Sequence, residues 1–281
     1  QLIARQETVR ALVRKSSAPE KVNLLKQWGA SLAEGDLKDP ASLAKACEGC
    51  ETVISTVSTT ISRQEGDNIQ SVDHDGQLHL VRAAKEAGVK HFIFISFRHQ
   101  HAPDTILTAA KRSTEKAIIA SGMNYTILQA SIFMEIWLSP ALGFNYPEHK
   151  VRVYGDGKNR VSYISYKDVA SFAAGSIGNP AALNRVIEVG GPEAISQLDA
   201  VKLFEQAAGQ SFILEFIPQF ALEQQMKEAP DPMDRVFAGI MLMYAQGDEI
   251  DNKTALAAIP VSLHSVNEYA AAVMKKEVQL S

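Results

Sequence analysis

The stretch HFIFISF at residues 91–97 decides the fold. It is apolar at nearly every position, and it follows a helical pattern at residues 75–87 that Gly88 ends. A run of this kind is typical of a parallel strand whose two faces are both covered by helices. The sequence therefore predicts a buried strand inside a layered α/β sheet.

Strand and helix patterns alternate on both sides of this stretch. The predicted strands are residues 8–14, 30–33, 52–57, 91–97 and 124–130, and the predicted helices are residues 19–29, 41–47, 75–87 and 104–121. Asp39 and Pro40 are expected to form the N-cap and first turn of the helix at residues 41–47. Such alternation predicts an α/β fold with a doubly wound parallel sheet of Rossmann type, because right-handed helical crossovers place helices on both faces. Beyond residue 130 the pattern loosens into short strands and helices, which predicts a smaller C-terminal α+β portion.

Composition excludes several classes of partner and location. The chain has 281 residues, and its 28 Lys and Arg residues nearly balance 32 Asp and Glu residues, giving a net charge of −4. This balance provides no overall field for nucleic acid or an anionic membrane, so neither partner is expected. The longest apolar runs fall short of the roughly 20 residues that span a bilayer. Residues 1–5 lack the apolar block of a secretory signal, and Cys47 and Cys50 are too few for a disulfide framework, so we expect a cytoplasmic protein.

Seven segments of the chain resemble one family in their residues, order and spacing. They are residues 8–14, 34–37 (EGDL), 52–58, 88–92 (GVKHF), 111–115, 121–134 and 163–170. The pattern is similar to that of the NmrA-like branch of atypical short-chain dehydrogenases, which includes quinone-reductase-like and isoflavone-reductase-like members. The resemblance covers nearly the whole chain and implies a Rossmann-type fold that binds NADP(H). It implies a dinucleotide-binding portion at residues 1–135 and a substrate or partner portion at residues 136–281 that is interleaved with the first.

The chain departs from the family pattern at its first residues. Family members open with a central strand and a Gly-rich turn whose backbone N–H groups hold the cofactor pyrophosphate. Here residues 1–5, QLIAR, resemble the end of the helix that follows that turn, and no G-x-G-x-x-G spacing occurs in the sequence. Because a parallel sheet without its middle strand would expose unpaired backbone groups, we expect roughly twenty further residues upstream.

The residues after the first predicted strands are candidates for binding the adenosine end of the cofactor. Arg14 and Lys15 stand where a carboxylate would bind the ribose of NAD, whereas cations favour the 2′-phosphate of NADP. The alternative is a solvated basic turn. The resemblance places Asp36 and Leu37 at the edge of the adenine, and the alternative is an ordinary turn.

Small hydroxyl-bearing residues end the strand predicted at residues 52–57. Thr56, Val57 and Ser58 would allow phosphates and ribose to approach closely, although ordinary strand chemistry also accounts for them. We therefore include them among the expected cofactor-binding residues.

Lys111 is the only candidate catalytic side chain that the resemblance identifies. Typical short-chain dehydrogenases carry a Ser at the end of the fifth strand and Tyr-x-x-x-Lys on the next helix, where the Tyr donates a proton. Ser96 and Phe97 end the corresponding strand and Lys111 matches the Lys, but position 107 is Leu, so the phenol is absent. The alternative is a solvated Lys111 that pairs with Glu115 four residues later.

The chain also departs from the family pattern at the turn that would lie beside the nicotinamide. Residues 130–133, Ala-Ser-Ile-Phe, stand where family members carry Pro-Gly-x-Phe. Ser131 and Ile132 are therefore expected at the nicotinamide.

Two further patterns are given structural explanations. Cys47 and Cys50 have the spacing of a redox motif, but we expect structural thiols because they lie between a helix and a strand. His99 and His101 form an H-x-H pair without an evident third ligand, so no metal site is expected.

Two functions of different classes are compatible with these residues. The first is an NADPH-dependent oxidoreductase that transfers hydride to a small flat acceptor such as a quinone or a conjugated ketone. The second is a non-catalytic NAD(P)-binding redox sensor or an assembly or regulatory protein. The expected partners are a small-molecule substrate and either a protein partner or a second copy of the chain.

Overall fold

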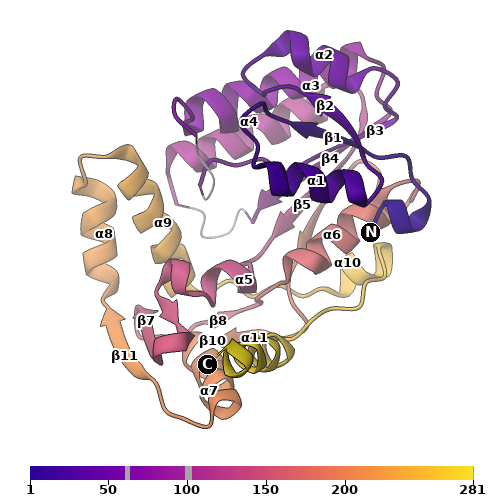
Figure 1. Cartoon of the computed structure of the whole chain (residues 1–281). Coiled ribbons are helices and arrows are strands. Elements are labelled where there is room, and N and C mark those ends of the chain that lie inside the picture. Colours follow the sequence, from indigo (N-terminus) through magenta and orange to yellow (C-terminus); the bar gives the residue numbers. More distant parts are fainter. Residues whose placement is uncertain (61–63, 99–102, 281) are drawn as a thin grey trace. The chain divides into compact units, whose positions relative to one another are not determined.

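The computed structural model of the chain describes residues 1–60, 64–98 and 103–280 (Figure 1). Its contacts divide the chain into two compact units. Unit 1 comprises Gln1–Ser96, Ala109–Ile127 and Ala173–Val186, and unit 2 comprises Phe97–Thr108, Leu128–Phe172 and Ile187–Ser281. Both units draw on segments from either side of residue 135. The functional boundary at that residue stays a prediction.

Parallel strands form the framework of unit 1. Strand β1 (Arg10–Val13) pairs in parallel with β2 (Ser31–Glu34), and β3 (Thr52–Ser55) pairs in parallel with β4 (His91–Phe97). The sheet that contains β4 has the order β3-β4-β5-β9, with β5 at Asn124–Ala130 and β9 at Arg185–Val189. The first four residues of β4 are fully buried. The prediction of a Rossmann-type parallel sheet with a buried strand at residues 91–97 is confirmed.

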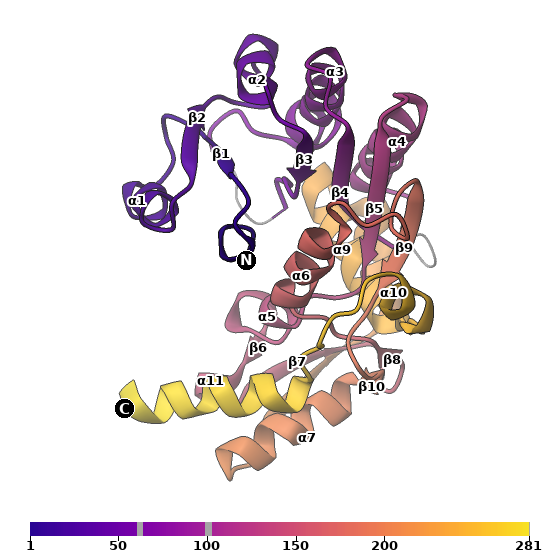
Figure 2. The same ribbon diagram turned by 90° about the vertical axis from the view of Figure 1, so that its right-hand side faces the viewer.

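The hydrogen-bonded ladder is interrupted between β1 and β3. Within the described part of the chain, β1 pairs with β2 alone and β3 pairs with β4 alone. Strands β1 and β3 therefore each have one edge without a ladder partner. Figure 2 shows β2, β1, β3 and β4 following one another across unit 1.

The helices of unit 1 begin and end at the signals that the sequence carries. Their bounds are η1 Ile3–Arg5, α1 Pro19–Gln27, α2 Pro40–Cys47, η2 Ile69–Gly76, α3 Gln77–Glu86 and α4 Ile106–Ala120, whose first residues belong to unit 2. Asp39 caps α2 by accepting a hydrogen bond from the Ala41 N–H at 3.1 Å, and Pro40 occupies the first turn, as predicted. Gly88 follows α3 with φ +75°, a conformation that favours glycine.

The helix predicted from residue 75 begins earlier than expected. A π-helical turn, η2, precedes α3, and Asn68 caps it in a reciprocal pair of hydrogen bonds with Ser71. Gly76 permits this path because a Cβ at that position would lie 2.8 Å from the Cβ of Leu37. The end of η2 therefore packs closely against the turn after β2.

Apolar side chains from three helices cover one face of the unit 1 strands. Figure 2 shows α2, α3 and α4 along that face. The buried cluster contains Leu37, Leu43, Leu80, Ala84, Phe92, Phe94 and Ile118. This cluster fixes the helices, and hence the polar groups that they carry, relative to the ends of the strands.

Unit 2 is a mixed α and β arrangement and is the larger of the two units. Its bounds are α5 Met134–Trp137, η3 Pro140–Leu142, β6 Phe144–Asn145, η4 Tyr146–Glu148, β7 Lys150–Tyr154, β8 Arg160–Val161, α6 Tyr166–Ser176, β10 Ile195–Ser196, α7 Gln197–Ala208, β11 Ile213–Ile217, α8 Gln219–Glu228, α9 Pro232–Gln246, α10 Lys253–Ala258 and α11 Val266–Leu280; α6 ends in unit 1. Strand β7 pairs in parallel with β11 and antiparallel with β6, while β8 and β10 form a short antiparallel pair.

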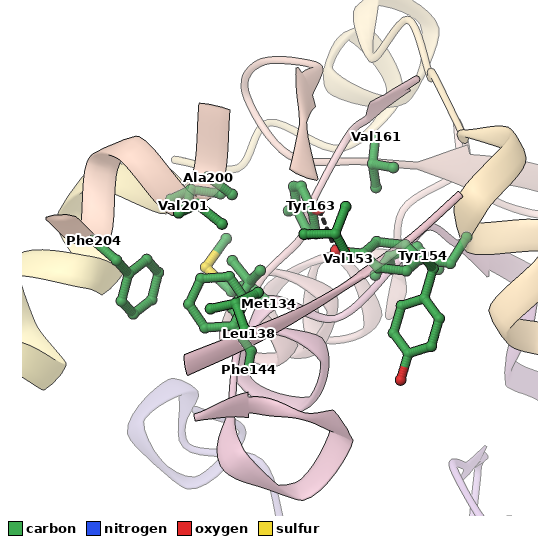
Figure 3. Packing of buried hydrophobic residues seen from close by; sticks show 14 of the residues in the cluster. Met134, Leu138, Phe144, Val153, Tyr154, Val161, Tyr163, Ala200, Val201 and Phe204 are labelled. Carbon is green, nitrogen blue, oxygen red and sulfur yellow. Dashed lines mark hydrogen bonds between the residues drawn. The ribbon is translucent and has the colours of Figure 1, made fainter. Parts of the chain in front are cut away.

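An apolar cluster holds unit 2 together (Figure 3). It includes Met134, Leu138, Phe144, Val153, Tyr163 and Phe204. The hydroxyl groups of Tyr163 and Tyr244 hydrogen-bond to each other inside it, which satisfies both buried phenols. Among the described residues, no helix is long and apolar enough to cross a membrane.

A buried histidine makes the stability of unit 1 depend on pH. The Thr126 hydroxyl donates to the Ala182 carbonyl at 2.8 Å, so it accepts from the His91 Nε2–H at 2.9 Å. Burial lowers the pKa of His91 below its ordinary value. The neutral ring is therefore the form that the fold stabilises.

We expect the free energy of unfolding to fall as the pH drops below about 6.5, because the unfolded chain then binds a proton that the folded His91 resists. The variant His91→Gln keeps an N–H donor for Thr126 and does not titrate. Urea unfolding at pH 7.5 and 5.5 should show a drop that is larger in the parent than in the variant, by at most about 1.4 kcal/mol, because pH 5.5 lies one unit below the pKa of an unfolded histidine. Equal drops in the two proteins would contradict this role for His91.

Candidate functional site

The predicted cofactor-binding residues of unit 1 follow the carboxyl ends of its parallel strands. Arg14 follows β1, residues 36–38 follow β2, residues 56–59 follow β3, and Ser96 lies near the end of β4. Open α/β sheets bind ligands beyond these strand ends. A ligand-binding site is therefore expected among the polar groups at this edge.

Two cations converge on one buried carboxylate beyond β1 and β2. Arg14 Nη1 lies 2.6 Å from Asp67 Oδ2, and Lys38 Nζ lies 2.5 Å from Asp67 Oδ1. The side chain of Asp67 is only 1% exposed, whereas those of Arg14 and Lys38 are 28% and 34% exposed. We call this trio the Arg14–Lys38 clamp.

The charge of the clamp follows from its hydrogen bonds. Burial by itself would raise the pKa of Asp67, but hydrogen bonds from Lys38, Arg14 and the Gln64 N–H outweigh it and lower that pKa to about 2. Asp67 is therefore ionised at neutral pH, and the clamp carries a net charge of one positive unit. Its cations are partly exposed and oriented by the carboxylate between them.

The structure separates Arg14 from Lys15, which the sequence placed together. Lys15 is 85% exposed, and its Nζ lies 3.6 Å from Oε1 of Glu34 in a surface ion pair. Such exposed pairs contribute little to stability. Lys38, which the sequence did not single out, takes the position beside Arg14.

Asp36 and Leu37 shape the turn that carries Lys38. Asp36 Oδ1 accepts a hydrogen bond from the Lys38 N–H at 2.8 Å, and the Asp36 N–H donates to the Ser42 hydroxyl at 3.1 Å. Leu37 is buried in the apolar cluster of unit 1. Their contact with an adenine stays a prediction.

The loop after β3 is held by side chains from three helical elements, α3, α4 and η2. The Val57 carbonyl accepts a hydrogen bond from Gln77 Nε2 at 3.2 Å and lies 3.5 Å from Lys111 Nζ. Two residues later, the N–H and hydroxyl of Thr59 donate to Asp73 Oδ2 at 3.0 and 2.6 Å. The loop that the sequence predicted as a cofactor contact is therefore fixed, while Thr56 and Val57 stay exposed.

Lys111 is buried rather than solvated. It is 6% exposed, and its ammonium lies 5.0 Å from the centre of the Phe94 ring. Burial lowers the pKa of Lys111, while the Asp73 carboxylate acts in the opposite direction, as does Glu115 more weakly. Arg112, whose Nη1 lies 2.7 Å from both Glu115 carboxylate oxygens, takes the ion pair that we had considered for Lys111. A solvated Lys111 is therefore excluded.

Asp73 is a buried charge that the sequence analysis missed. It is completely buried in η2, and its Oδ1 has no hydrogen-bond partner among the described residues. Residues 69, 72, 73, 76 and 80 have helical spacing and are all buried, so Asp73 stands on an apolar stripe. A lone acid on such a stripe was the signal in the sequence.

Some predicted residues lie in the cores of their own units. Ser96, in unit 1, is buried, and its hydroxyl has no hydrogen-bond partner within the described chain. Phe97, Ser131 and Ile132 belong to unit 2. Ser131 donates its N–H to the Val189 carbonyl at 2.9 Å, and Ile132 packs in the apolar cluster of that unit. Their contact with a nicotinamide stays a prediction.

The cysteine and histidine motifs have different outcomes. Cys47 and Cys50 are free thiols, and burial raises the pKa of Cys47 to about 11, so its thiol stays protonated and unreactive at neutral pH. His99 and His101 lie outside the described residues. Within the part that is described, no three His, Cys, Asp or Glu residues form a group that could hold a metal ion.

Comparisons with known proteins agree on one family. The sequence pattern of the NmrA-like family matches residues 1–270. The chain is 32% identical over 228 residues to photosystem II assembly factor Ycf39 of Trieres chinensis, covering 79% of this chain and 68% of that protein. It is 30% identical over 255 residues to the isoflavone reductase homolog IRL of Zea mays, covering 85% of this chain and 79% of that protein.

A solved structure shows the same fold. NADPH-dependent quinone oxidoreductase QOR2 of Escherichia coli, solved in complex with NADPH, superposes with a TM-score of 0.73 at 22% identity. The match covers 94% of this chain and 89% of that one.

The hydrogen bonds of Asp73 generate a prediction about stability. Replacing Thr59 by Val removes a hydroxyl that donates to a buried carboxylate. We expect the free energy of unfolding to fall by about 2 kcal/mol, the size of a hydrogen bond to a charged group. Thr56→Val, three residues earlier on the exposed part of the loop, is the matched control and should change it by less than about 0.5 kcal/mol. Equal effects in urea denaturation would show that Thr59 does not hold Asp73.

Proposed function

The chain belongs to the NmrA-like family, and from that premise we propose that it is an NADPH-dependent oxidoreductase acting on a small flat acceptor such as a quinone or a conjugated ketone. The observation that carries this proposal is the edge of unit 1. An oriented pair of cations, a fixed loop and a buried lysine all lie there, beyond the ends of parallel strands. The Escherichia coli quinone oxidoreductase, whose structure contains NADPH, supports this choice of cofactor and acceptor.

The residues of this edge fit NADP(H) at two points. Arg14 and Lys38 present partly exposed cations, which suit the dianionic 2′-phosphate that distinguishes NADP from NAD. Lys111 presents an ammonium whose described hydrogen-bond acceptor is the Val57 carbonyl at 3.5 Å, which leaves donors for ribose hydroxyls. The loop at residues 56–59 would lie between these two points.

The proposed reaction requires little of the protein beyond binding the cofactor and placing a positive charge near the acceptor. NADPH, when bound, supplies the hydride. Lys111 would hold the cofactor and place a positive charge near the oxygen of the acceptor, where negative charge develops. Leu107, one helical turn earlier, is buried, and its side chain has no proton to donate. A quinone suits this arrangement because its reduced form can take protons from water.

A second candidate is a protein that binds NAD(P) without turnover and assists assembly or regulation. The similarity to the photosystem II assembly factor of Trieres chinensis, at 32% identity, favours it. The absence of a phenol at position 107 is compatible with both candidates. The two differ in whether bound NADPH is oxidised.

The clamp leads to a prediction about cofactor choice. Arg14→Ala should weaken NADPH binding about ten- to a hundredfold, because it removes a charge-assisted pair worth roughly 1.5 to 3 kcal/mol. NADH binding should change little. Lys15→Ala, the neighbouring exposed cation, is the control and should leave both affinities nearly unchanged. Isothermal titration calorimetry with both cofactors measures this, and equal losses for NADPH and NADH would show that Arg14 does not bind the phosphate.

Turnover separates the two functions. We expect the protein to oxidise NADPH when members of a quinone panel are added, and we expect Lys111→Ala to lose at least about tenfold in rate or in cofactor affinity. Absorbance at the reduced-nicotinamide band measures the rate, and circular dichroism checks that the variant is folded. Tight NADPH binding with no oxidation across the panel would instead support the assembly or regulatory function. If Lys111→Ala changed neither the rate nor the cofactor affinity, the proposed enzyme would have no candidate catalytic side chain.

A further inference from the structure

Two buried ionisable groups in unit 1 share one short loop. Lys111 Nζ reaches the carbonyl of Val57, and Asp73 Oδ2 accepts from both donors of Thr59. The loop residues are separated by Ser58 alone, so the two groups approach it at nearly the same place. They come from different elements, Lys111 from α4 and Asp73 from η2.

Neither group is satisfied by the hydrogen bonds that it makes. At 3.5 Å, the contact from Lys111 to Val57 is longer than a typical bond from an ammonium group, which is about 2.7 to 2.9 Å. Asp73 Oδ1 is buried and has no hydrogen-bond partner within the described residues. An isolated buried charge costs several kcal/mol, roughly, in a protein interior. A buried cation and a buried carboxylate that face the same loop reduce that cost for each other.

The charges around Lys111 identify Asp73 as its main compensating group. From its own helix, Arg112 and Glu115 act on Lys111 with opposite signs, and they also form an ion pair with each other. From η2, Asp73 acts on Lys111, and among these three charges its effect is the largest. The local balance therefore depends on the Asp73 carboxylate.

We propose that Asp73 is a positioning residue, which fixes the loop at residues 57–59 through Thr59 and keeps Lys111 in its cationic form. This inference rests on the proposed function, because it assigns Asp73 a role through the lysine that is proposed to bind the cofactor. A cationic Lys111 donates to ribose hydroxyls and stabilises negative charge on the acceptor, whereas a neutral amine would do neither well. Asp73 itself touches neither cofactor nor acceptor in this proposal.

The isosteric variant Asp73→Asn tests the charge separately from the shape. The Asn carbonyl can still accept from both Thr59 donors, while the negative charge is removed. We expect the pKa of Lys111 to fall by about one unit or more, as it does when an opposite charge nearby is lost. Asp75→Asn is the matched control, since Asp75 lies two residues away in η2, is half exposed and pairs with His74. It should leave the pKa of Lys111 nearly unchanged.

The pKa is measured without reference to activity. Lysine labelled with ¹³C at Cε gives a resonance for each side chain, and the signal that Lys111→Met removes is that of Lys111. A fall in Asp73→Asn that exceeds the fall in Asp75→Asn supports the proposal. Equal shifts in the two variants would overturn it.

Turnover provides a second readout, which separates the failure of this proposal from failure of the proposed function. If the protein oxidises NADPH, the alkaline limb of its pH profile should move to lower pH in Asp73→Asn by the same shift as the pKa. An unmoved limb overturns the proposal even though the reductase function stands. If no acceptor is reduced, the function fails, and the titration of Lys111 still decides the role of Asp73.

A double-mutant cycle covers the case in which Asp73→Asn alone is poorly folded. Lys111→Met leaves the Asp73 charge without its cation, so the midpoint of thermal unfolding should fall. Adding Asp73→Asn to Lys111→Met should then raise the midpoint again. A further fall in the double variant, equal to the sum of the single effects, would show that the two groups do not compensate each other.

Discussion

Compensation of buried carboxylates is the constraint on which the edge of unit 1 depends. Asp67 and Asp73 both belong to the segment between β3 and α3, and both side chains are buried. Asp67 is neutralised by Arg14 and Lys38, which follow two other strands, and Asp73 is compensated by Lys111 from α4. Because a buried carboxylate without a cation is costly, the arrangement of strand ends, loop and helix at this edge has to keep each acid near a cation.

The fold was largely predictable because its signals are local. The apolar run at residues 91–97 and the cap formed by Asp39 and Pro40 each depend on a few neighbouring residues, and both were confirmed. The passage from η2 into α3 was missed; it packs at Gly76 against Leu37, a contact between segments that are distant in the sequence. Arg14, Lys111 and Val57 were predicted to be site residues, but the side chains and backbone groups that they contact were not predicted.

The contacts of the candidate site could not be predicted for a similar reason. The pair of Arg14 with Asp67 joins residues 53 positions apart, and nothing in the turn around Asp67 indicates burial. In the sequence, a lysine at position 111 looks the same whether its side chain is solvated or buried. Its packing against Phe94 and the loop at Val57 is what buries it. Asp73 could have been found, since an acid on an apolar helical stripe requires a partner. In each case the contact joins residues that are distant in the sequence, and local sequence patterns do not show such contacts.

The central proposal is that the Arg14–Lys38 clamp binds the 2′-phosphate of NADP. The most direct measurement compares two adenosine fragments that lack the nicotinamide, 2′,5′-ADP and 5′-AMP, by titration calorimetry against the same protein at low and high salt. If the clamp binds the phosphate, 2′,5′-ADP binds at least about tenfold more tightly than 5′-AMP at low salt, and this advantage shrinks as salt screens the clamp. Equal affinities for the two fragments at both salt concentrations would contradict it.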